Sequence, residues 1–197
     1  MCDPVRTSHL SSQLDRIIRW LRFRKIVPHI PPGAVVCDIG CGENAVFLRS
    51  IAPKISRGYG FDIVVKSFED HALKISAYDL QGVIPLPDQS IHIVTLMAVL
   101  EHLTHPQEIL NEIFRVLKPG GKLLLTAPTP LAKPILEFLA FRLHLIDEAS
   151  IRDHKTYFWR EDLKRMLTNA GFSSQHLKHS YFELYCNNDV IVERQSA

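Results

Sequence analysis

The sequence predicts an α/β protein whose doubly wound, mostly parallel sheet ends in a C-terminal antiparallel β-hairpin. Three observations support this fold class. Apolar runs of strand length alternate with amphipathic segments, and a glycine-hinged loop follows the first run, Val35–Ile39. The last two apolar runs are separated by Asn187 and Asn188, residues that favour a hairpin turn.

The size and charge of the chain limit its function classes. Its 197 residues fit one domain, 1–197, and its net charge of +2 gives little electrostatic attraction for nucleic acid. Met1–Leu10 lacks the apolar core of a secretory signal, and no run reaches the ~18 apolar residues of a membrane span. We therefore expect a cytoplasmic protein that does not bind nucleic acid.

The cysteine pattern gives no sign of a metal site. Cys2, Cys37, Cys41 and Cys186 include no C-x-x-C pair, and such pairs are the usual signature of structural zinc. A disulfide framework is not expected either, because free thiols are the ordinary state of a cytosolic enzyme.

Residues 8–30 are predicted to form an N-terminal helical cap. Leu14–Val27 alternates apolar residues with arginines at helical spacing, and the connector Pro28–Gly33 ends the helix. Such a helix either lies on a membrane surface or covers one face of a sheet with its arginines in solvent. We favour the second interpretation because interfacial helices are the rarer class, and peripheral membrane contact stays open.

The remaining elements are expected in an alternating order. The predicted parallel strands are Val35–Ile39, Gly58–Ile63, Ile75–Leu80, Ile91–Met97 and Lys122–Ala127. The predicted helices are Ala45–Ile51, a short one in Lys66–Leu73, one from Thr104 to Leu117, and Arg160–Ala170. The hairpin strands are Ser180–Tyr185 and Val190–Glu193. Thr104 and Gln107 are expected to form a capping box, and Lys118–Gly121 to end the helix that they begin.

The loop after the first strand is the strongest candidate for a binding site. Asp38 lies near the carboxyl end of that strand, where open α/β sheets bind their ligands. Gly40 and Gly42 allow a sharp turn and a close approach of a ligand to the backbone. A carboxylate beside such a loop suits a ligand that carries an amine or sugar hydroxyl groups.

Three motifs and their order point to a known family. These are Asp38-Ile39-Gly40-Cys41-Gly42, Leu100-Glu101-His102-Leu103 and the corner Leu117-Lys118-Pro119-Gly120-Gly121-Lys122. Together they resemble the class I S-adenosylmethionine-dependent methyltransferases, particularly the compact small-molecule type, which have a Rossmann-like fold. The matching segments cover most of the chain from Val35 onward.

The resemblance implies S-adenosylmethionine as cofactor, S-adenosylhomocysteine as product, and contacts at the matching positions. Asp38 and the Gly40–Gly42 backbone would face the methionine part, and Asp62 would accept hydrogen bonds from both ribose hydroxyls. Asp79 would accept a bond from the adenine amine. The other implied contacts are Cys41 and Asn44 in the loop, Ile63 on the adenine face, the Leu80 backbone at the ring, and Met97, Ala98 and Val99 on the methionine side.

Two other functions fit the same loop. Gly40–Ala45 also matches the dinucleotide fingerprint G-x-G-x-x-A, with Asp62 about 20 residues on. We favour methylation for three reasons. Asp38 would lie close to dinucleotide phosphates, and the chain is too short for the usual separate substrate domain. The Lys118–Gly121 corner with its terminal hairpin is typical of methyltransferases. A non-catalytic protein that binds S-adenosylmethionine is the second alternative.

Catalysis of methyl transfer requires mainly alignment of the reactants, and a base only where the acceptor must lose a proton. His102 and His154 are the candidate bases, although each could instead be a structural histidine. Residues 130–155 are a candidate lid over the substrate, since Leu131–Ile146 is apolar on more than one face. This segment could cover a hydrophobic small-molecule acceptor, touch a membrane, form a dimer contact or pack on the core.

Overall fold

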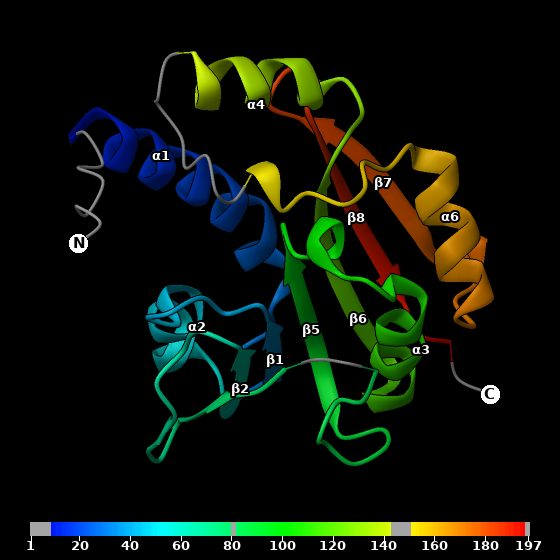
Figure 1. The fold of residues 1–197 in the computed structure, drawn as a ribbon. Helices are drawn as coiled ribbons and strands as arrows, with labels where there is room; N and C mark the ends of the chain where they lie inside the picture. Colours follow the sequence, from blue (N-terminus) through cyan, green and yellow to red (C-terminus); the bar gives the residue numbers. More distant parts are fainter. Residues whose placement is uncertain (1–8, 80–81, 143–150, 196–197) are drawn as a thin grey trace.

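The computed structural model describes residues 9–79, 82–142 and 151–195, with side chains described from residue 16 onward. Its centre is an eight-stranded sheet of order β3-β4-β2-β1-β5-β6-β8-β7 (Figure 1). The strands are β1 (Val35–Ile39), β2 (Arg57–Asp62), β3 (Phe68–Glu69), β4 (Leu73–Ala77), β5 (Ile91–Met97), β6 (Leu117–Pro128), β7 (Leu177–Phe182) and β8 (Asn187–Glu193). Strands β4, β2, β1, β5 and β6 pair in parallel, whereas β3, β8 and β7 pair antiparallel with their neighbours. The predicted fold class is confirmed.

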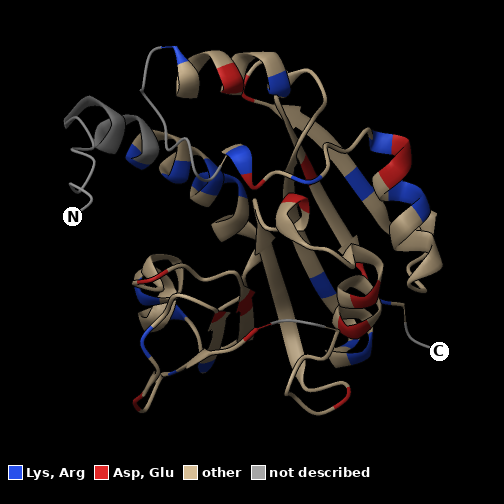
Figure 2. Ribbon diagram, in the orientation of Figure 1, with Lys and Arg blue, Asp and Glu red and all other residues tan. Residues whose placement is uncertain are grey.

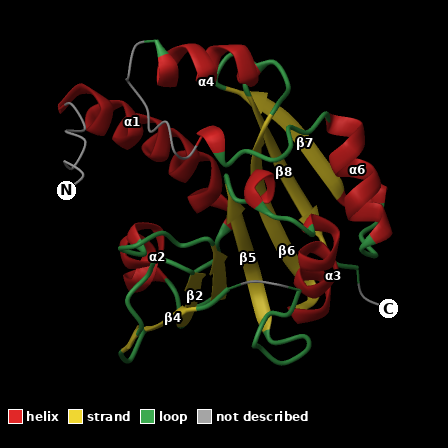
Figure 3. Ribbon diagram, viewed as in Figure 1, coloured by secondary structure: helices red, strands yellow, loops and turns green. Residues whose placement is uncertain are grey.

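Helices cover both faces of the sheet (Figure 3). They are α1 (His9–Ile26), α2 (Val46–Ile51), α3 (Pro106–Val116), α4 (Ala132–Phe141) and α6 (Arg160–Asn169), with 3-10 turns at Val27–His29, Ala52–Lys54, Leu100–His102 and Ser174–His176. The core is accordingly divided into two clusters. One holds Ile109 of α3 and Leu163 of α6, and the other holds Ile26 of α1 and Leu48 of α2. No helix among the described residues is long and apolar enough to span a membrane.

The helix predicted in Lys66–Leu73 is wrong. The chain there forms the short edge strand β3 and a turn that returns it antiparallel into β4. Asp70 makes the turn, because its Oδ1 accepts hydrogen bonds from the N–H groups of Ala72 and Leu73 at 2.8 and 2.7 Å. This local side-chain bond competes with helix formation.

The expected capping box does not form. His105 occupies the N-cap position of α3 without a side-chain cap. Thr104 Oγ1 instead accepts a hydrogen bond from Lys155 Nζ at 2.8 Å, and Gln107 Nε2 donates to Asn111 Oδ1 and to the Met166 carbonyl. Tertiary partners therefore take both side chains. The Lys118–Gly121 corner is also placed differently, since it lies inside β6 at an irregularity in its pairing with β5.

The hairpin turn lies four residues earlier than predicted. Asn187 and Asn188 begin β8 and are buried, and the turn spans 183–186 with Glu183, Leu184 and Tyr185 all at positive φ. Asn188 is drawn into the sheet because its Nδ2 donates to the carbonyls of Ala127 and Phe158 at 3.2 and 2.9 Å. Because buried polar groups need hydrogen-bond partners, these two acceptors favour Asn188 as a strand residue over Asn188 as a turn residue.

The packing of α2 on β2 depends on the absence of a side chain at Gly60. A Cβ built there would lie 2.6 Å from Ile75 Cδ1, 2.9 Å from Leu48 Cδ1 and 3.1 Å from Cys41 Sγ. The glycine therefore lets α2 and the loop before it lie directly on the sheet.

Gly60→Ala is expected to destabilise the protein by about 1–3 kcal/mol, the usual cost of overpacking a core. The added methyl group must displace both Leu48 of α2 and Cys41. Urea unfolding measures the change, with the exposed α6 variant Lys164→Ala as control, which should stay within about 0.5 kcal/mol of the parent. Equal stability of Gly60→Ala and the parent would contradict this account of the packing.

Candidate functional site

Two adjoining cavities lie at the carboxyl ends of the central parallel strands, the position expected for a ligand in this topology. We call the cavity of about 580 Å³ that Arg19, Arg22, Asp38 and Glu101 help to line the arginine cavity. The cavity of about 850 Å³ beside Asp62 is called the Asp62 cavity. Gly40, Ala98 and His102 line both cavities, so one ligand could extend from one into the other.

Three backbone N–H groups of the glycine loop donate hydrogen bonds to β2, two to a carbonyl group and one to a side chain. The N–H groups of Gly40 and Cys41 donate to the Phe61 carbonyl at 2.8 and 3.2 Å, and that of Gly42 donates to Asp62 Oδ2 at 2.8 Å. Gly40 has φ +72°, and a Cβ there would collide with the Val99 side chain. Only glycine therefore fits at this position, and its backbone is left open to a ligand.

Several predicted cofactor residues meet at the Asp62 cavity. Asp62 Oδ1 accepts a hydrogen bond from the Val64 N–H at 3.1 Å, so each carboxylate oxygen has one protein donor and a further lone pair for a ligand. Ile63 is 70% exposed at the rim, and Asp79 lines the same space. Val99, expected on the methionine side, also lines this cavity and not the arginine cavity. Leu80 lies outside the described residues.

Asp38 is a buried carboxyl group with one unused oxygen. It is 1% exposed, and its Oδ1 accepts a hydrogen bond from Thr95 Oγ1 at 2.6 Å. Its Oδ2 has no partner among the described residues, although Asp38 lines the arginine cavity. Burial raises the pKa of Asp38 to about 7, against the lowering effect of the Thr95 bond. A ligand with an ammonium group would satisfy this oxygen and stabilise its charge.

The other predicted loop and strand residues are also brought together. Asn44, Met97 and Ala98 line the arginine cavity, as does Cys41. Burial, with Asp38 and Asp62 nearby, raises the pKa of the Cys41 thiol to about 12, so this cysteine is not a reactive nucleophile.

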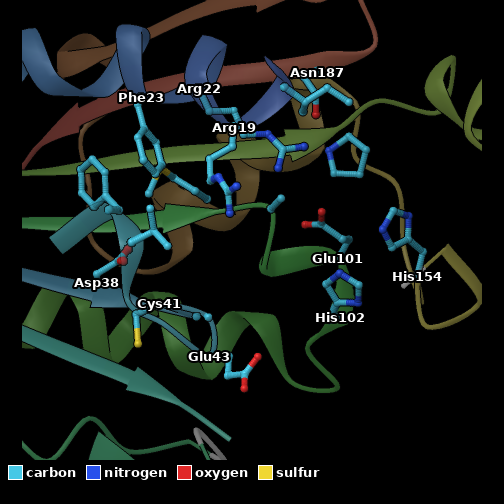
Figure 4. A pocket seen from close by; sticks show the side chains of 18 of the residues that line it. Arg19, Arg22, Phe23, Asp38, Cys41, Glu43, Glu101, His102, His154 and Asn187 are labelled. Carbon is cyan, nitrogen blue, oxygen red and sulfur yellow. The ribbon is translucent and has the colours of Figure 1, made fainter. Parts of the chain in front are cut away.

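Arginines of α1 form part of the cavity wall, which the sequence analysis missed. Basic residues recur along α1 (Figure 2), and the side chains of Arg19 and Arg22 reach toward the space that Glu101 faces (Figure 4). Arg22 is half-buried, and its Nε has no partner among the residues that the structure describes. The expectation that these arginines are solvated holds for Arg16, Arg19 and Arg24, which are exposed, but not for Arg22. Arg24 stacks on Trp20 at 4.7 Å. One sequence feature could have identified these two arginines: at helical spacing, Arg19 and Arg22 lie on the same face of the helix as the core residue Ile26.

The two predicted catalytic histidines lie side by side. The rings of His102 and His154 are 4.8 Å apart in an edge-to-face arrangement. His102 Nδ1 lies 2.9 Å from Asp153 Oδ2, and His154 Nδ1 lies 3.1 Å from the Tyr157 hydroxyl. Burial, assisted by His102, lowers the pKa of His154 to about 4. His154 is therefore a neutral imidazole at pH 7, able to accept or relay a proton.

Glu101 lies against this pair of histidines. It is 1% exposed, burial raises its pKa to about 7, and its Oε2 has no partner in the described part of the chain. Glu183 of the β7–β8 turn and Asn187 at the start of β8 complete the wall, and the Asn187 amide donates a hydrogen bond to the Glu183 carboxylate. Sequence reasoning missed both, because it assigned Glu183 to the strand Ser180–Tyr185 and Asn187 to the hairpin turn.

The sequence of the chain matches known methyltransferases over most of its length. Residues 9–177 match the family model described as a methyltransferase domain. A relative from Laribacter hongkongensis, named ubiquinone/menaquinone biosynthesis C-methyltransferase UbiE, is 30% identical over 194 residues, covering 85% of this chain and 78% of its own. A protein of the same name from Neisseria meningitidis is 28% identical over 193 residues, covering 84% of this chain and 76% of its own.

Solved structures share the fold at lower identity. A SAM-dependent methyltransferase from Archaeoglobus fulgidus superposes with a TM-score of 0.68 at 19% identity, covering 91% of this chain and 94% of its own. A putative methyltransferase from Haloferax volcanii, solved in complex with the methyltransferase activator Trm112, gives 0.66 at 16% identity, covering 98% and 100% of the two chains.

Asp38→Asn is expected to remove a pH dependence of stability. Because the pKa of Asp38 is raised from 3.8 to about 7 by folding, the folded protein keeps a proton that the unfolded chain loses in this range. The contribution is complete below about pH 4 and is lost as the pH rises to about 7, by up to ~4 kcal/mol.

Urea unfolding of the parent and of Asp38→Asn at several pH values tests this prediction. The stability difference between the two proteins should change in favour of the variant as the pH rises. Glu161→Gln, which changes an exposed carboxylate of α6 that lines neither cavity, is the control and should follow the parent. A constant difference between the parent and Asp38→Asn would contradict the burial of an ionisable Asp38.

Proposed function

The chain belongs to the methyltransferase-domain family and is an S-adenosylmethionine-dependent methyltransferase, and from this premise we propose that it methylates a small acceptor with an acidic group and an apolar part. The proposal rests on the two adjoining cavities, one beside Asp62 and one walled by Arg19 and Arg22. Family membership also counts against the dinucleotide and the non-catalytic alternatives.

We assign the adenosine part of the cofactor to the Asp62 cavity. The free lone pairs of Asp62 suit the two ribose hydroxyls, and Ile63, Asp79 and Val99 surround the space for the base. The methionine part would extend past Gly40 toward Asp38, whose Oδ2 lacks a partner and suits an ammonium group. The residues present therefore fit this cofactor.

The cofactor, when bound, supplies a methyl group on a positively charged sulfur, and an acceptor atom attacks that group as the carbon–sulfur bond breaks. The protein's task is to align the two reactants and to exclude water. Ala98 and His102 border both cavities and would therefore flank the point of transfer. Where the acceptor carries a proton, neutral His154 and His102 are the candidate bases, and both are within the same cluster.

The acceptor class follows from the walls of the arginine cavity. Arg19 and Arg22 offer cationic donors suited to a carboxylate, phenolate or phosphate group. Phe23 and Leu136 provide apolar surface in the same cavity. Leu136 comes from the proposed lid, residues 130–155, of which 143–150 lie outside the described residues. The names of the UbiE relatives, ubiquinone/menaquinone biosynthesis C-methyltransferases, support a ring with an apolar substituent and carbon as the methylated atom.

Exposed apolar side chains near this cavity keep peripheral membrane contact open. Ile17 and Trp20 of α1 are 54% and 53% exposed, and Ile135 and Phe138 of α4 are 47% and 54% exposed. Membrane contact and a cytoplasmic location stay predictions. Co-sedimentation with anionic liposomes at low salt, where charge attraction is least screened, tests the first of them.

Asp62→Ala is expected to weaken the binding of S-adenosylhomocysteine by on the order of 100-fold, because two charge-assisted hydrogen bonds are lost. Asp62→Asn keeps the shape and one acceptor oxygen, so its loss should be about tenfold. Calorimetric titration measures both, with Glu161→Ala as the control outside the cavities and NAD as the control ligand. Tight binding of NAD, or unchanged affinity in both Asp62 variants, would contradict the assignment of the Asp62 cavity.

Arg22→Met is expected to lower kcat/KM by about 10–100-fold for acidic acceptors and to leave S-adenosylhomocysteine affinity unchanged. Methionine keeps most of the apolar stem but removes the charge that faces the cavity. A panel of alkylated phenols with and without a carboxylate measures the effect. Arg24→Met is the matched control, since Arg24 lies on the same helix but stacks on Trp20. Equal losses for neutral and acidic acceptors would refute an anion-binding role.

A further inference from the structure

A cluster of three potential metal ligands lies in the arginine cavity. One ligand atom from each of Glu101, His102 and His154 lies within 4.8 Å of the others. The backbone holds the cluster together, because the Glu101 carbonyl accepts hydrogen bonds from the N–H groups of Lys155 and Thr156 at 2.8 and 3.4 Å. Two segments about fifty residues apart in sequence are thus fixed against each other at this point.

The buried carboxylate of Glu101 is the second observation that points to a bound cation. Glu101 is 1% exposed and lines the cavity, yet its Oε2 has no hydrogen-bond partner in the described residues. An ionised carboxylate in such a place is costly unless a cation or several donors neutralise it. Figure 4 shows its carboxylate turned toward the side of the cavity where Arg19 and Arg22 lie, with the rings of His102 and His154 beside it.

Both histidines have the outer hydrogen bonds that are typical of metal ligands. His102 Nδ1 can donate to Asp153 Oδ2 at 2.9 Å, which leaves Nε2 for an ion. His154 Nδ1 pairs with the Tyr157 hydroxyl at 3.1 Å and leaves its Nε2 in the same way. Partners of this kind fix the ring and raise its basicity toward a metal.

We propose that Glu101, His102 and His154 bind a divalent transition-metal ion in the arginine cavity. Two imidazoles and one carboxylate suit Zn²⁺ and related first-row ions and leave coordination positions open. The role of the ion rests on the proposed function: an open position would hold an oxygen of the acceptor and lower the pKa of a hydroxyl there, and His102 and His154 would then act as ligands in place of bases. The sequence analysis missed this site because it considered only cysteine spacing.

Arg22 is the competing partner for Glu101. Burial raises the pKa of Glu101, and the charge of Arg22 only partly opposes this effect. Arg22 also interacts electrostatically with His154. However, neither Arg22 Nε nor Glu101 Oε2 has a hydrogen-bond partner within the described ranges, so the guanidinium does not occupy the oxygen assigned to the ion. The carboxylate of Asp153 behind His102 and an acidic acceptor would offset the positive charge of Arg19 and Arg22.

Titration of chelator-treated protein with Zn²⁺ in a calorimeter tests the proposal, and the visible absorption of Co²⁺ provides a second readout. We expect one ion per chain in the parent. Glu101→Gln and His154→Ala should each weaken binding by on the order of 100-fold, and Asp153→Asn by about tenfold. His176→Ala is the control: it removes an exposed histidine that lines neither cavity, so the affinity for Zn²⁺ should not change.

The variants also distinguish this proposal from the proposed function. Glu101→Gln is nearly isosteric and removes a buried charge, so this variant should fold. Its thermal unfolding in the absence of metal verifies that it does. Titration with S-adenosylhomocysteine in the absence of metal tests the cofactor site separately. Failure of the parent to bind Zn²⁺, or equal Zn²⁺ affinity in Glu101→Gln, His154→Ala and the parent, would overturn the metal site even where the homocysteine nucleoside binds.

Discussion

The hydrogen bond from the Gly42 N–H to Asp62 Oδ2 is the contact around which the site is organised. It ties the loop after β1 to the end of β2, and the two bonds to the Phe61 carbonyl hold the start of the same loop. The Asp62 cavity and the arginine cavity meet along this fixed loop at Gly40. A rigid, side-chain-free boundary of this kind lets one ligand reach both spaces without a change in the sheet.

The centre of the sheet could be predicted from the sequence, whereas its edges could not. Val35–Ile39 and Ile91–Met97 are buried on both faces, so their apolar runs identify them as parallel strands. The edge strand β3 has two residues and depends on the Asp70 turn. The start of β8 depends on the buried amide of Asn188, whose acceptors Ala127 and Phe158 are remote in sequence. Contacts between residues so far apart in the sequence leave no local sequence pattern from which they could be predicted.

The same division applies to the site. Asp38, Gly40, Gly42 and Asp62 directly follow or end predicted strands, and they could be placed from strand order alone. The arginine cavity could not, because its wall combines α1, the turn after β5, the region around His154 and the β7–β8 turn. Which arginine of α1 faces inward depends on how the helix packs through Ile26 and Phe23 on the sheet and α2.

The origin of the cavity walls has a consequence for how relatives of this chain can diverge. The residues assigned to the cofactor lie at the ends of strands and in the loops that follow them, whereas Arg19, Arg22 and Leu136 lie on helices outside the sheet. Substitutions on those helices alter the shape and charge offered to an acceptor and leave strand register untouched. Natural variation can therefore retarget the enzyme without rebuilding its cofactor site, and the N-terminal helix is the place to look for that change.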